Sequence, residues 1–358
     1  MMRYVVILFL LMNSLLPAHA QRVNTDAVVS FWQVVDQLER DRPLGDSLWN
    51  AYYHLPGNIG YMDNNRGAEQ AEEHRRYLEL VFRPSRADSL RRLEEDQAKP
   101  NDDILDNLLY IKANERRLRS YTSRVISPVY LQRCMKLARR YIPKHSVRAL
   151  PDYFTIYIMA LTFDAAVGDS SMYFGIARVY EYDKYRRGAV AGHELHHQMR
   201  VERELAHPVS AADSAVFSAV YQINNEGSAD LIDKMLLLEN PGKIFRGAST
   251  VHRLIDSAAR TIRQLDSCFK INAAEMGAFV TARQFRKVMN YSSGHLPGLY
   301  MDQIIQRNGL KSRFIRHDDD PFQFFYLYNE AAGKDPANPP VFSAEAIAYL
   351  QRLEKNVL

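Results

Sequence analysis

Apolar residues recur at helical spacing through the first part of the chain, from about residue 23 to residue 143. The clearest apolar faces are those of Phe31, Val34, Val35 and Leu38, and of Ile104, Leu108 and Ile111. Asn101 or Asp102 is a candidate N-cap ahead of the second face, because short side-chain oxygens accept hydrogen bonds from the first helical N–H groups. The periodicity predicts a helical N-terminal region.

The pattern changes after Pro151. Residues 153–163 and 171–182 are rich in β-branched and aromatic side chains, and residues 167–170 between them are turn-forming. We expect two strands joined as a hairpin. Helical spacing returns over residues 184–205 and 211–238, and further helices complete the chain.

This order of elements predicts an α+β fold that is mostly α-helical, because strands and helices run in separate blocks. We expect a helical N-terminal region over residues 21–150 and a second domain, with a short β-sheet, over residues 151–358.

The first twenty residues differ from all that follow. Arg3 precedes an apolar run from Tyr4 to Met12, and the segment ends in Ala18-His19-Ala20. This pattern predicts a secretory signal peptide, residues 1–20, cleaved after Ala20. The apolar run is shorter than the roughly 18 residues that a membrane-spanning helix needs. We therefore expect a secreted or periplasmic protein without stable membrane insertion after cleavage.

Composition narrows the class of protein. The 358 residues are 47% hydrophobic and 25% charged, which excludes a disordered or fibrous chain. The formal charge is only +4, with acids and bases interleaved, so nucleic acid is not an expected partner. For Cys134 and Cys268 in an oxidising compartment the sequence leaves two alternatives, a single disulfide or two buried thiols.

The candidate chemistry lies in residues 192–198, which read Gly-His-Glu-Leu-His-His-Gln. His193 and His197 are one helical turn apart on the same face, so both imidazoles can reach one Zn²⁺. Glu194 follows the first histidine directly, beside the position that the metal leaves open. It can accept a proton from water there without being a ligand. His196 points about 100° away from His197 and is expected to pack rather than to bind metal.

A catalytic zinc ion takes three protein ligands, so a third is needed. Arg200 and Arg203 stand where a metzincin has Gly and the third His, which excludes that pattern. Glu226 is 29 positions after His197, enough chain to bring a second helix against the first. Rival ligands are Glu202, Glu204 and Asp213, but the first two are expected on the same helix as the histidines. Glu226 is therefore the predicted third ligand.

Asp230 lies one helical turn after Glu226, where it can accept the free N–H of a zinc-bound histidine and so fix the orientation of the ring. Small Gly227, Ser228 and Ala229 between the two acids allow two helices to approach closely.

The motif His193-Glu194-x-x-His197, followed by Glu226-Gly-Ser-Ala-Asp230, resembles the gluzincin branch of zinc metallopeptidases. The layout as a whole is similar to a family of secreted bacterial proteins named zinc-dependent peptidases from their motifs, with no known function. The resemblance is strongest from about Pro151 to Gly333. It implies a zincin-like catalytic half, in which the strand before the motif helix lines the cleft, and its motifs are specific for Zn²⁺, but it implies no substrate. A peptide or protein substrate is expected only from the hypothesis that the protein is a peptidase.

Peptide hydrolysis also needs a donor to the oxyanion, which in gluzincins is a downstream His or Tyr. The segment from Tyr291 to Tyr300 precedes and enters a predicted helix with Pro297 in its first turn. His295 is the first candidate for this donor and Tyr291 the second.

Two functions of different class follow from these residues. The first is a secreted zinc metallopeptidase in which Glu194 activates a zinc-bound water. The second is an exported, non-catalytic binding or scaffold protein that keeps a zincin-like fold and a structural zinc. Glu194 favours the enzyme, because a structural zinc site has no use for an uncoordinated carboxylate beside an open position.

Overall fold

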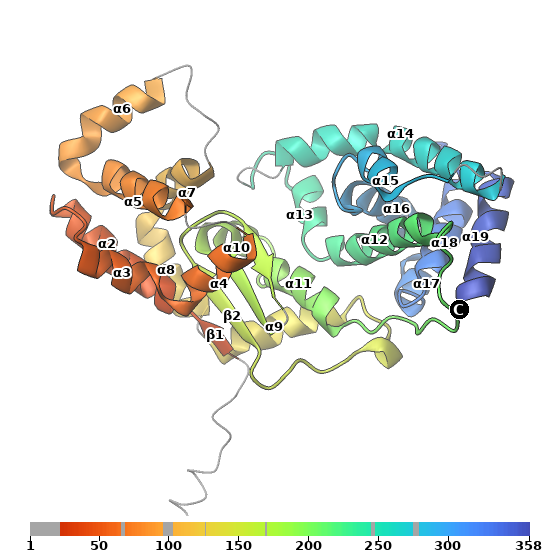
Figure 1. The fold of residues 1–358 in the computed structure, drawn as a ribbon, viewed down its shortest axis with the longest axis horizontal. Coiled ribbons are helices and arrows are strands. Elements are labelled where there is room, and N and C mark those ends of the chain that lie inside the picture. Colours follow the sequence, from red (N-terminus) through yellow and green to blue (C-terminus); the bar gives the residue numbers. More distant parts are fainter. Residues whose placement is uncertain are drawn as a thin grey trace, which may run out of the picture. The chain divides into compact units, whose positions relative to one another are not determined.

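The computed structural model describes residues 22–65, 69–95, 103–125, 127–168, 170–244, 248–274 and 279–358. The predicted signal peptide and the predicted N-cap at residue 101 or 102 lie outside these residues. Over the described part of the chain the protein is mostly helical, with one four-stranded mixed sheet (Figure 1). The predicted fold class, α+β and mostly α-helical, is confirmed.

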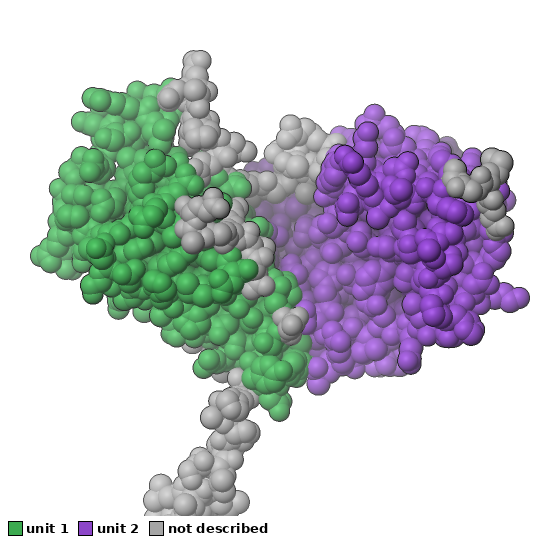
Figure 2. Space-filling model, in the orientation of Figure 1, with its two compact units in different colours: residues 1–128, 150–176 green, residues 129–149, 177–358 purple. Residues whose placement is uncertain are grey.

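The chain forms two compact units, shown in different colours in Figure 2. The first unit contains residues 1–128 and 150–176, and the second contains residues 129–149 and 177–358. The strands near residue 150 are thus grouped with the N-terminal helices, and residues 129–149 with the C-terminal ones. The division into a region 21–150 and a domain 151–358 stays a prediction.

The helices of the first unit bury the apolar faces that the sequence predicted. Phe31, Val34 and Leu38 have no exposed surface, and neither have Leu108 and Ile111. These residues lie on α2 (Asp26–Glu39) and α7 (Asp103–Ala113). The other described helices of the unit are α3 (Asp46–Tyr53), α4 (Pro56–Asn65), α5 (Glu69–Phe82), α6 (Ala87–Glu95) and α8 (Glu115–Val125).

The sheet corrects the predicted hairpin. Its strands are β1 (Arg22–Asn24), β2 (Thr155–Met159), β3 (Ala165–Val167) and β4 (Ser171–Gly175), in the order β1-β2-β4-β3. The two predicted strands contribute β2 and β4, which are parallel, and β4 forms its antiparallel pair with the short strand β3. Gly175 permits this path, because a Cβ there would lie 1.9 Å from the Thr162 carbonyl oxygen of the crossing loop.

The second unit is helical. Its helices are α9 (Pro128–Arg139), α10 (Ile176–Asp183), α11 (Ala189–Met199), α12 (Ser214–Asp230), α13 (Lys234–Glu239), α14 (Ala248–Ala273), α15 (Ala282–Val288), α16 (His295–Arg307), α17 (Lys311–Arg316), α18 (Pro321–Ala332) and α19 (Ala344–Val357). Among the described helices none combines the length and apolar character needed to cross a membrane.

Three boundaries of helices and strands predicted from the sequence differ from those in the structure. The chain after Gly175 becomes α10 rather than continuing as a strand. The helix predicted over residues 184–205 is α11 alone and ends at Met199, because Arg200 turns extended and pairs with Val147 in a β-bridge. The helix predicted over residues 211–238 is broken at residues 231–233 into α12 and α13.

The core of the second unit is built mainly by α12, α14, α16, α18 and α19. The two cysteines are both buried and free, Cys134 on α9 and Cys268 on α14. Of the two states that the sequence left open, the structure has the two thiols.

Helices α12 and α16 approach each other at a pair of glycines. A Cβ on Gly298 would lie 2.7 Å from the Gly227 Cα atom and from the Ile223 carbonyl oxygen. The close helix approach predicted for the small residues after Glu226 is confirmed at Gly227. It is also what brings the first residue of α16, His295, toward Glu226 of α12.

We expect Gly298→Ala to destabilise the protein by about 1–3 kcal/mol, the usual cost of forcing an extra methyl group into a packed contact. Denaturant unfolding measures this change. The control is Gly45→Ala, because Gly45 has an ordinary φ and no neighbour within 4 Å of the position that an added methyl group would take. Gly242→Ala would not serve, because the backbone φ of Gly242 is +69°. Equal stability of Gly298→Ala and Gly45→Ala would contradict the role of the glycine contact.

Candidate metal centre

Helix α11 places His193 and His197 on the side that faces α12. The helix begins after Gly188, which has a left-handed φ of 85°. Gly192 packs against α9, where a Cβ would lie 3.1 Å from the Leu137 Cβ atom. His193 is 100° further round the helix, so it turns away from α9. The His193 side chain is 3% exposed and that of His197 is 18% exposed.

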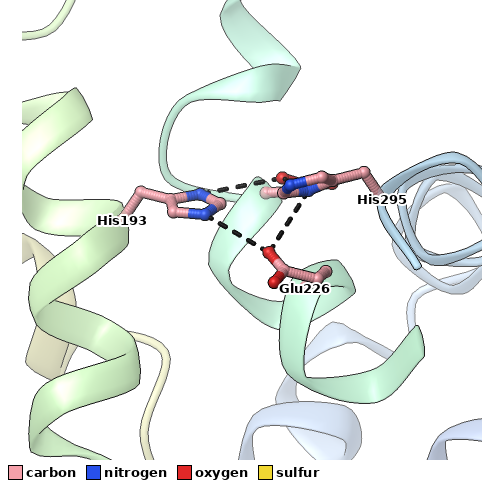
Figure 3. Close-up of side chains that lie close together, drawn as sticks. His193, Glu226 and His295 are labelled. Carbon is pink, nitrogen blue, oxygen red and sulfur yellow. Dashed lines mark hydrogen bonds and ion pairs between the residues drawn. The ribbon is translucent and has the colours of Figure 1, made fainter. Parts of the chain in front are cut away.

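The two histidines and Glu226 form a small triangle of potential ligand atoms. The Nε2 atoms of His193 and His197 are 3.2 Å apart. Glu226 Oε2 is 3.5 Å from the first of these nitrogens and 3.3 Å from the second. Figure 3 shows how His193 and Glu226 point toward each other from α11 and α12. The structure thus brings together the three residues that the sequence predicted as metal ligands.

This triangle fits a zinc ion. Three ligand atoms at tetrahedral angles and at bonds of about 2.0–2.2 Å are roughly 3.3–3.6 Å apart, close to the distances found here. Two imidazole nitrogens and a carboxylate oxygen are also a common donor set for catalytic zinc.

The charges around the triangle favour a cation. Burial alone would lower the pKa of His193, but the charge of Asp233 and the hydrogen bonds to Asp233 and Glu226 together outweigh burial and raise this pKa to about 10. Burial would likewise raise the pKa of Glu226, but hydrogen bonds from His193 and His197 hold it well below its usual range. The acids therefore keep positive charge on His193 at neutral pH, and a metal ion can take the place of that charge.

Both predicted histidine ligands are oriented by residues that the sequence analysis did not select. His193 Nδ1 donates to Asp233 Oδ1 at 2.8 Å, and His197 Nδ1 donates to Asn225 Oδ1 at 3.1 Å. Arg200 Nη1 donates to the same Asn225 oxygen at 3.3 Å. With Nδ1 occupied in this way, each ring presents Nε2 to the centre of the triangle. Asn225 is the neighbour of Glu226, and Asp233 lies seven residues after Glu226, beyond the end of α12.

Asp230 was predicted to bond to a zinc-bound histidine, and its short contact is with His295, which is not one of the two histidines predicted as ligands. The Asp230 Oδ1 atom is 3.7 Å from His193 Nδ1 but 2.9 Å from His295 Nδ1. Asp233 thus takes, at His193, the orienting role that the sequence predicted for Asp230 at a zinc-bound histidine, because the break after α12 turns Asp233 inward. A second set of four potential ligand atoms, all within 4.8 Å of one another, comes from His193, Glu226, Asp230 and His295. Since His295 Nδ1 is already bonded to Asp230, the triangle with His197 is the better cation site.

The two predicted oxyanion residues are placed differently. His295 begins α16, is 35% exposed at its side chain, and has Nδ1 3.3 Å from Glu226 Oε2 (Figure 3). Tyr291 is 70% exposed, and in the described part of the chain no side-chain contact with the triangle is recorded for it. The structure brings His295 to the centre and leaves Tyr291 in the loop before α16.

Glu194 is half-buried beside the triangle. A carboxylate oxygen of Glu194 and one ring nitrogen each of His193 and His197 lie within 4.8 Å of one another. Among the described residues no hydrogen bond or ion pair is recorded for this carboxylate. It is therefore close to the potential metal ligands and free to accept a proton.

The rival ligands are engaged elsewhere. Glu202 accepts a hydrogen bond from the Tyr221 hydroxyl, and Asp213 accepts bonds from Tyr349 at 2.6 Å and Ser210 at 2.7 Å. Glu204 is exposed. His196, expected to pack rather than to bind metal, is fully buried with Nε2 3.6 Å from Asp318 Oδ2.

Fold and site together define a helical protein with an HExxH helix and a carboxylate from a later helix. A sequence model of the family described as putative zinc dependent peptidase (DUF5700) matches residues 49–337. The chain belongs to this family, as the resemblance predicted. No curated protein and no solved structure matches the chain.

We expect Asp233→Asn to weaken zinc binding by about 10–100-fold, the usual effect of removing a carboxylate that orients a ligating histidine. The amide cannot supply the negative charge that polarises the His193 ring. Competition with a zinc chelator of known affinity measures the change. Asp256→Asn, a change to an exposed acid on helix α14, is the control, and an affinity equal in both variants would contradict the role of Asp233.

Asp302 of α16 gives a prediction on stability. Its carboxyl group is fully buried, and in the described residues neither oxygen has a hydrogen-bond partner. Burial, with Asp230 and Asp318 nearby, raises the pKa of Asp302 well above its ordinary value. A raised acid pKa means that the folded state loses stability as pH rises above the unfolded-state value. Asp302→Asn should therefore stabilise the protein at neutral pH and remove the loss of stability that begins as the pH rises above about 4, the ordinary pKa of an aspartic acid. Urea unfolding at several pH values tests this.

Proposed function

We propose that the protein is an exported zinc metallopeptidase of the gluzincin type, with His193, His197 and Glu226 as metal ligands. The observation that carries the proposal is the Glu194 carboxylate, which lies beside His193 and His197 and has no hydrogen-bond or ion-pair partner among the described residues. A site that only held a structural metal would have no need of it. Membership of a family described as zinc dependent peptidases supports the same class of reaction. The apolar leader with Ala18-His19-Ala20 supports export.

Each residue of the site has a separate task. When bound, zinc supplies a Lewis acid that polarises the scissile carbonyl and makes water easier to deprotonate. Glu194 accepts the proton of the attacking water and then delivers it to the nitrogen of the leaving amine. Asp233 and Asn225 hold the two histidine rings so that Nε2 of each faces the ligand triangle.

His295 is the proposed donor to the oxyanion. Its Nδ1 atom donates to Asp230 Oδ1 at 2.9 Å, and Asp230 is fully buried. This bond fixes the plane of the ring and leaves Nε2 as the atom available to substrate. In its charged form His295 can donate from both nitrogens, to Asp230 and to the developing oxyanion. Tyr291 has no comparable support, so His295 remains the first candidate.

The experiment that tests the proposal combines metal analysis with an unbiased peptide-library digest of the chain from Gln21 to Leu358, the expected mature form. We expect close to one equivalent of zinc and cleavage that stops on chelation and returns when zinc is added back. Zinc without any cleavage would instead favour the non-catalytic binding or scaffold protein. Cleavage that persists after zinc has been removed would refute the metallopeptidase.

A further inference from the structure

In one long stretch of the chain every Asp, Glu, Lys or Arg position is occupied by Lys or Arg. Residues 116–151 contain ten Lys and Arg residues and no Asp or Glu. Because the whole chain has a formal charge of +4, removing this segment's +10 leaves −6 for the rest. The charges are therefore less evenly interleaved than the overall composition indicates. Six of the ten cations belong to the second unit, on and after α9: Arg133, Lys136, Arg139, Arg140, Lys144 and Arg148. We call these six residues the basic face.

All six side chains of the basic face belong to exposed residues. Within the described residues no ion pair is recorded for any of them, and the acid contact of this segment is that of His145 with Asp319 at 2.9 Å. Arg148 Nε donates to the Gln198 carbonyl oxygen at 2.6 Å, which fixes its side chain without neutralising its charge. The positive charge of the basic face is thus left to solvent.

The geometry of α9 directs this charge outward. Cys134 and Ala138 of α9 are fully buried, and Cys134 lies against Gly188 and Gly192 at and near the start of α11. At 100° per residue, Lys136 falls on the opposite side of the helix from these two positions, and Arg133 lies about 100° or more away from each of them. Since α9 packs against the side of α11 that carries Gly192, the basic face also points away from the ligand triangle. It is not placed to select substrates there.

A residue from elsewhere in the sequence extends the basic face. Lys311, at the start of α17, has its Nζ atom 5.0 Å from the centre of the Tyr141 ring. Arg140 approaches the same ring at 5.8 Å. The fold therefore adds a cation from a segment far along the chain to those of α9, which makes a surface rather than a single helical stripe.

We propose that the basic face is a docking surface for an anionic phospholipid membrane, to which the protein binds peripherally. Clusters of four to eight Lys and Arg residues on an exposed surface are attracted to anionic lipid headgroups. Val129, which is 60% exposed, lies one turn before Arg133 on the same side of α9. An apolar side chain is therefore available at the lipid boundary. The side of α9 that carries Val129, Arg133 and Lys136 has no aromatic side chain on which a nucleic-acid base could stack. This favours lipid over single-stranded nucleic acid.

The test is co-sedimentation of the chain from Gln21 to Leu358 with vesicles, so that the apolar first twenty residues contribute nothing. Vesicles of phosphatidylcholine with about 30% phosphatidylglycerol are compared with vesicles of phosphatidylcholine alone. We expect binding to the anionic vesicles only, and release when NaCl is raised from about 0.05 M to about 0.5 M, because salt screens exposed charges.

A triple variant locates the binding surface. Arg133→Gln, Lys136→Gln and Arg140→Gln together should weaken partitioning into anionic vesicles on the order of 100-fold, since each cation near a membrane contributes a factor of about five. Glutamine keeps the helix propensity of α9, and circular dichroism confirms folding. The matched control is Arg283→Gln, Arg286→Gln and Lys287→Gln on α15, three exposed residues with the same total charge. The control should bind vesicles as the unaltered chain does.

Three results would overturn the proposal. These are equal binding to neutral and anionic vesicles, equal losses in the α9 and α15 variants, and binding of double-stranded DNA under conditions in which vesicles are not bound. The proposal is independent of the zinc chemistry, so Glu194→Gln should bind vesicles like the unaltered chain whether or not the protein is a peptidase.

Discussion

Glu194→Gln is expected to lower peptide hydrolysis by at least ~10²–10⁴-fold, the part of the rate that a positioned general base supplies. The amide has the size and shape of the carboxylate but cannot accept the proton of the attacking water. Because Glu194 is not one of the three proposed ligands, zinc content should be unchanged. Turnover on the peptides found in the library digest, measured together with metal content, gives both quantities for one sample.

The control for this prediction is Glu202→Gln. Glu202 is an exposed acid that follows α11 and bonds to Tyr221, so the same change of charge is made near the site but outside it. It should leave turnover within a few-fold of the unaltered chain. A Glu194→Gln variant that keeps both its zinc and full turnover would refute the proposed mechanism.

Replacement of His193 or His197 by Ala should abolish stoichiometric zinc binding, because each change removes one corner of the ligand triangle and leaves only two protein ligands. Glu226→Gln should weaken binding strongly as well, since an amide oxygen is a poorer zinc ligand than a carboxylate. The structure strengthens this expectation, because Oε2 of Glu226 lies within 3.5 Å of a nitrogen of both histidines. Isothermal titration or chelator competition measures the affinities.

Glu202→Gln and Glu204→Gln are the controls for Glu226→Gln, and neither should change zinc affinity. If all three glutamine variants bind zinc alike, Glu226 is not the third ligand. His295→Ala distinguishes the two overlapping ligand sets: zinc should be retained if His197 completes the site, whereas loss of zinc would mean that His295 is itself a ligand.

Much of the metal centre could be predicted because its residues are local in sequence. The positions of His193 and His197 are four apart, and helix geometry alone places them on one face. Glu226 was found by its chemistry and by its distance along the chain, and Asp230 by the same helical rule. The helical rule did not indicate Asp233 as the partner of His193, because α12 ends at Asp230 and it is the turn after the helix that directs Asp233 inward.

Pairing between strands was harder to predict than helix periodicity. The composition of residues 153–163 and 171–182 indicated extended structure, but it could not show that β2 and β4 are parallel. The direction depends on β3 and on the close crossing at Gly175, which are contacts between segments rather than properties of either strand. The same holds for the end of α11 at Met199, where the β-bridge from Val147 to Arg200 replaces further helix.

The sequence by itself determined the mostly helical α+β class, the pair of histidines on one helix and the identity of the acid that joins them, because periodicity and side-chain chemistry are local. Only the tertiary structure decided which groups surround those ligands. Asp233 reaches His193, Asn225 reaches His197, and Asp230 turns to His295. These contacts join residues 28 to 65 positions apart, and they exist because α11, α12 and α16 pack together at small residues such as Gly227 and Gly298.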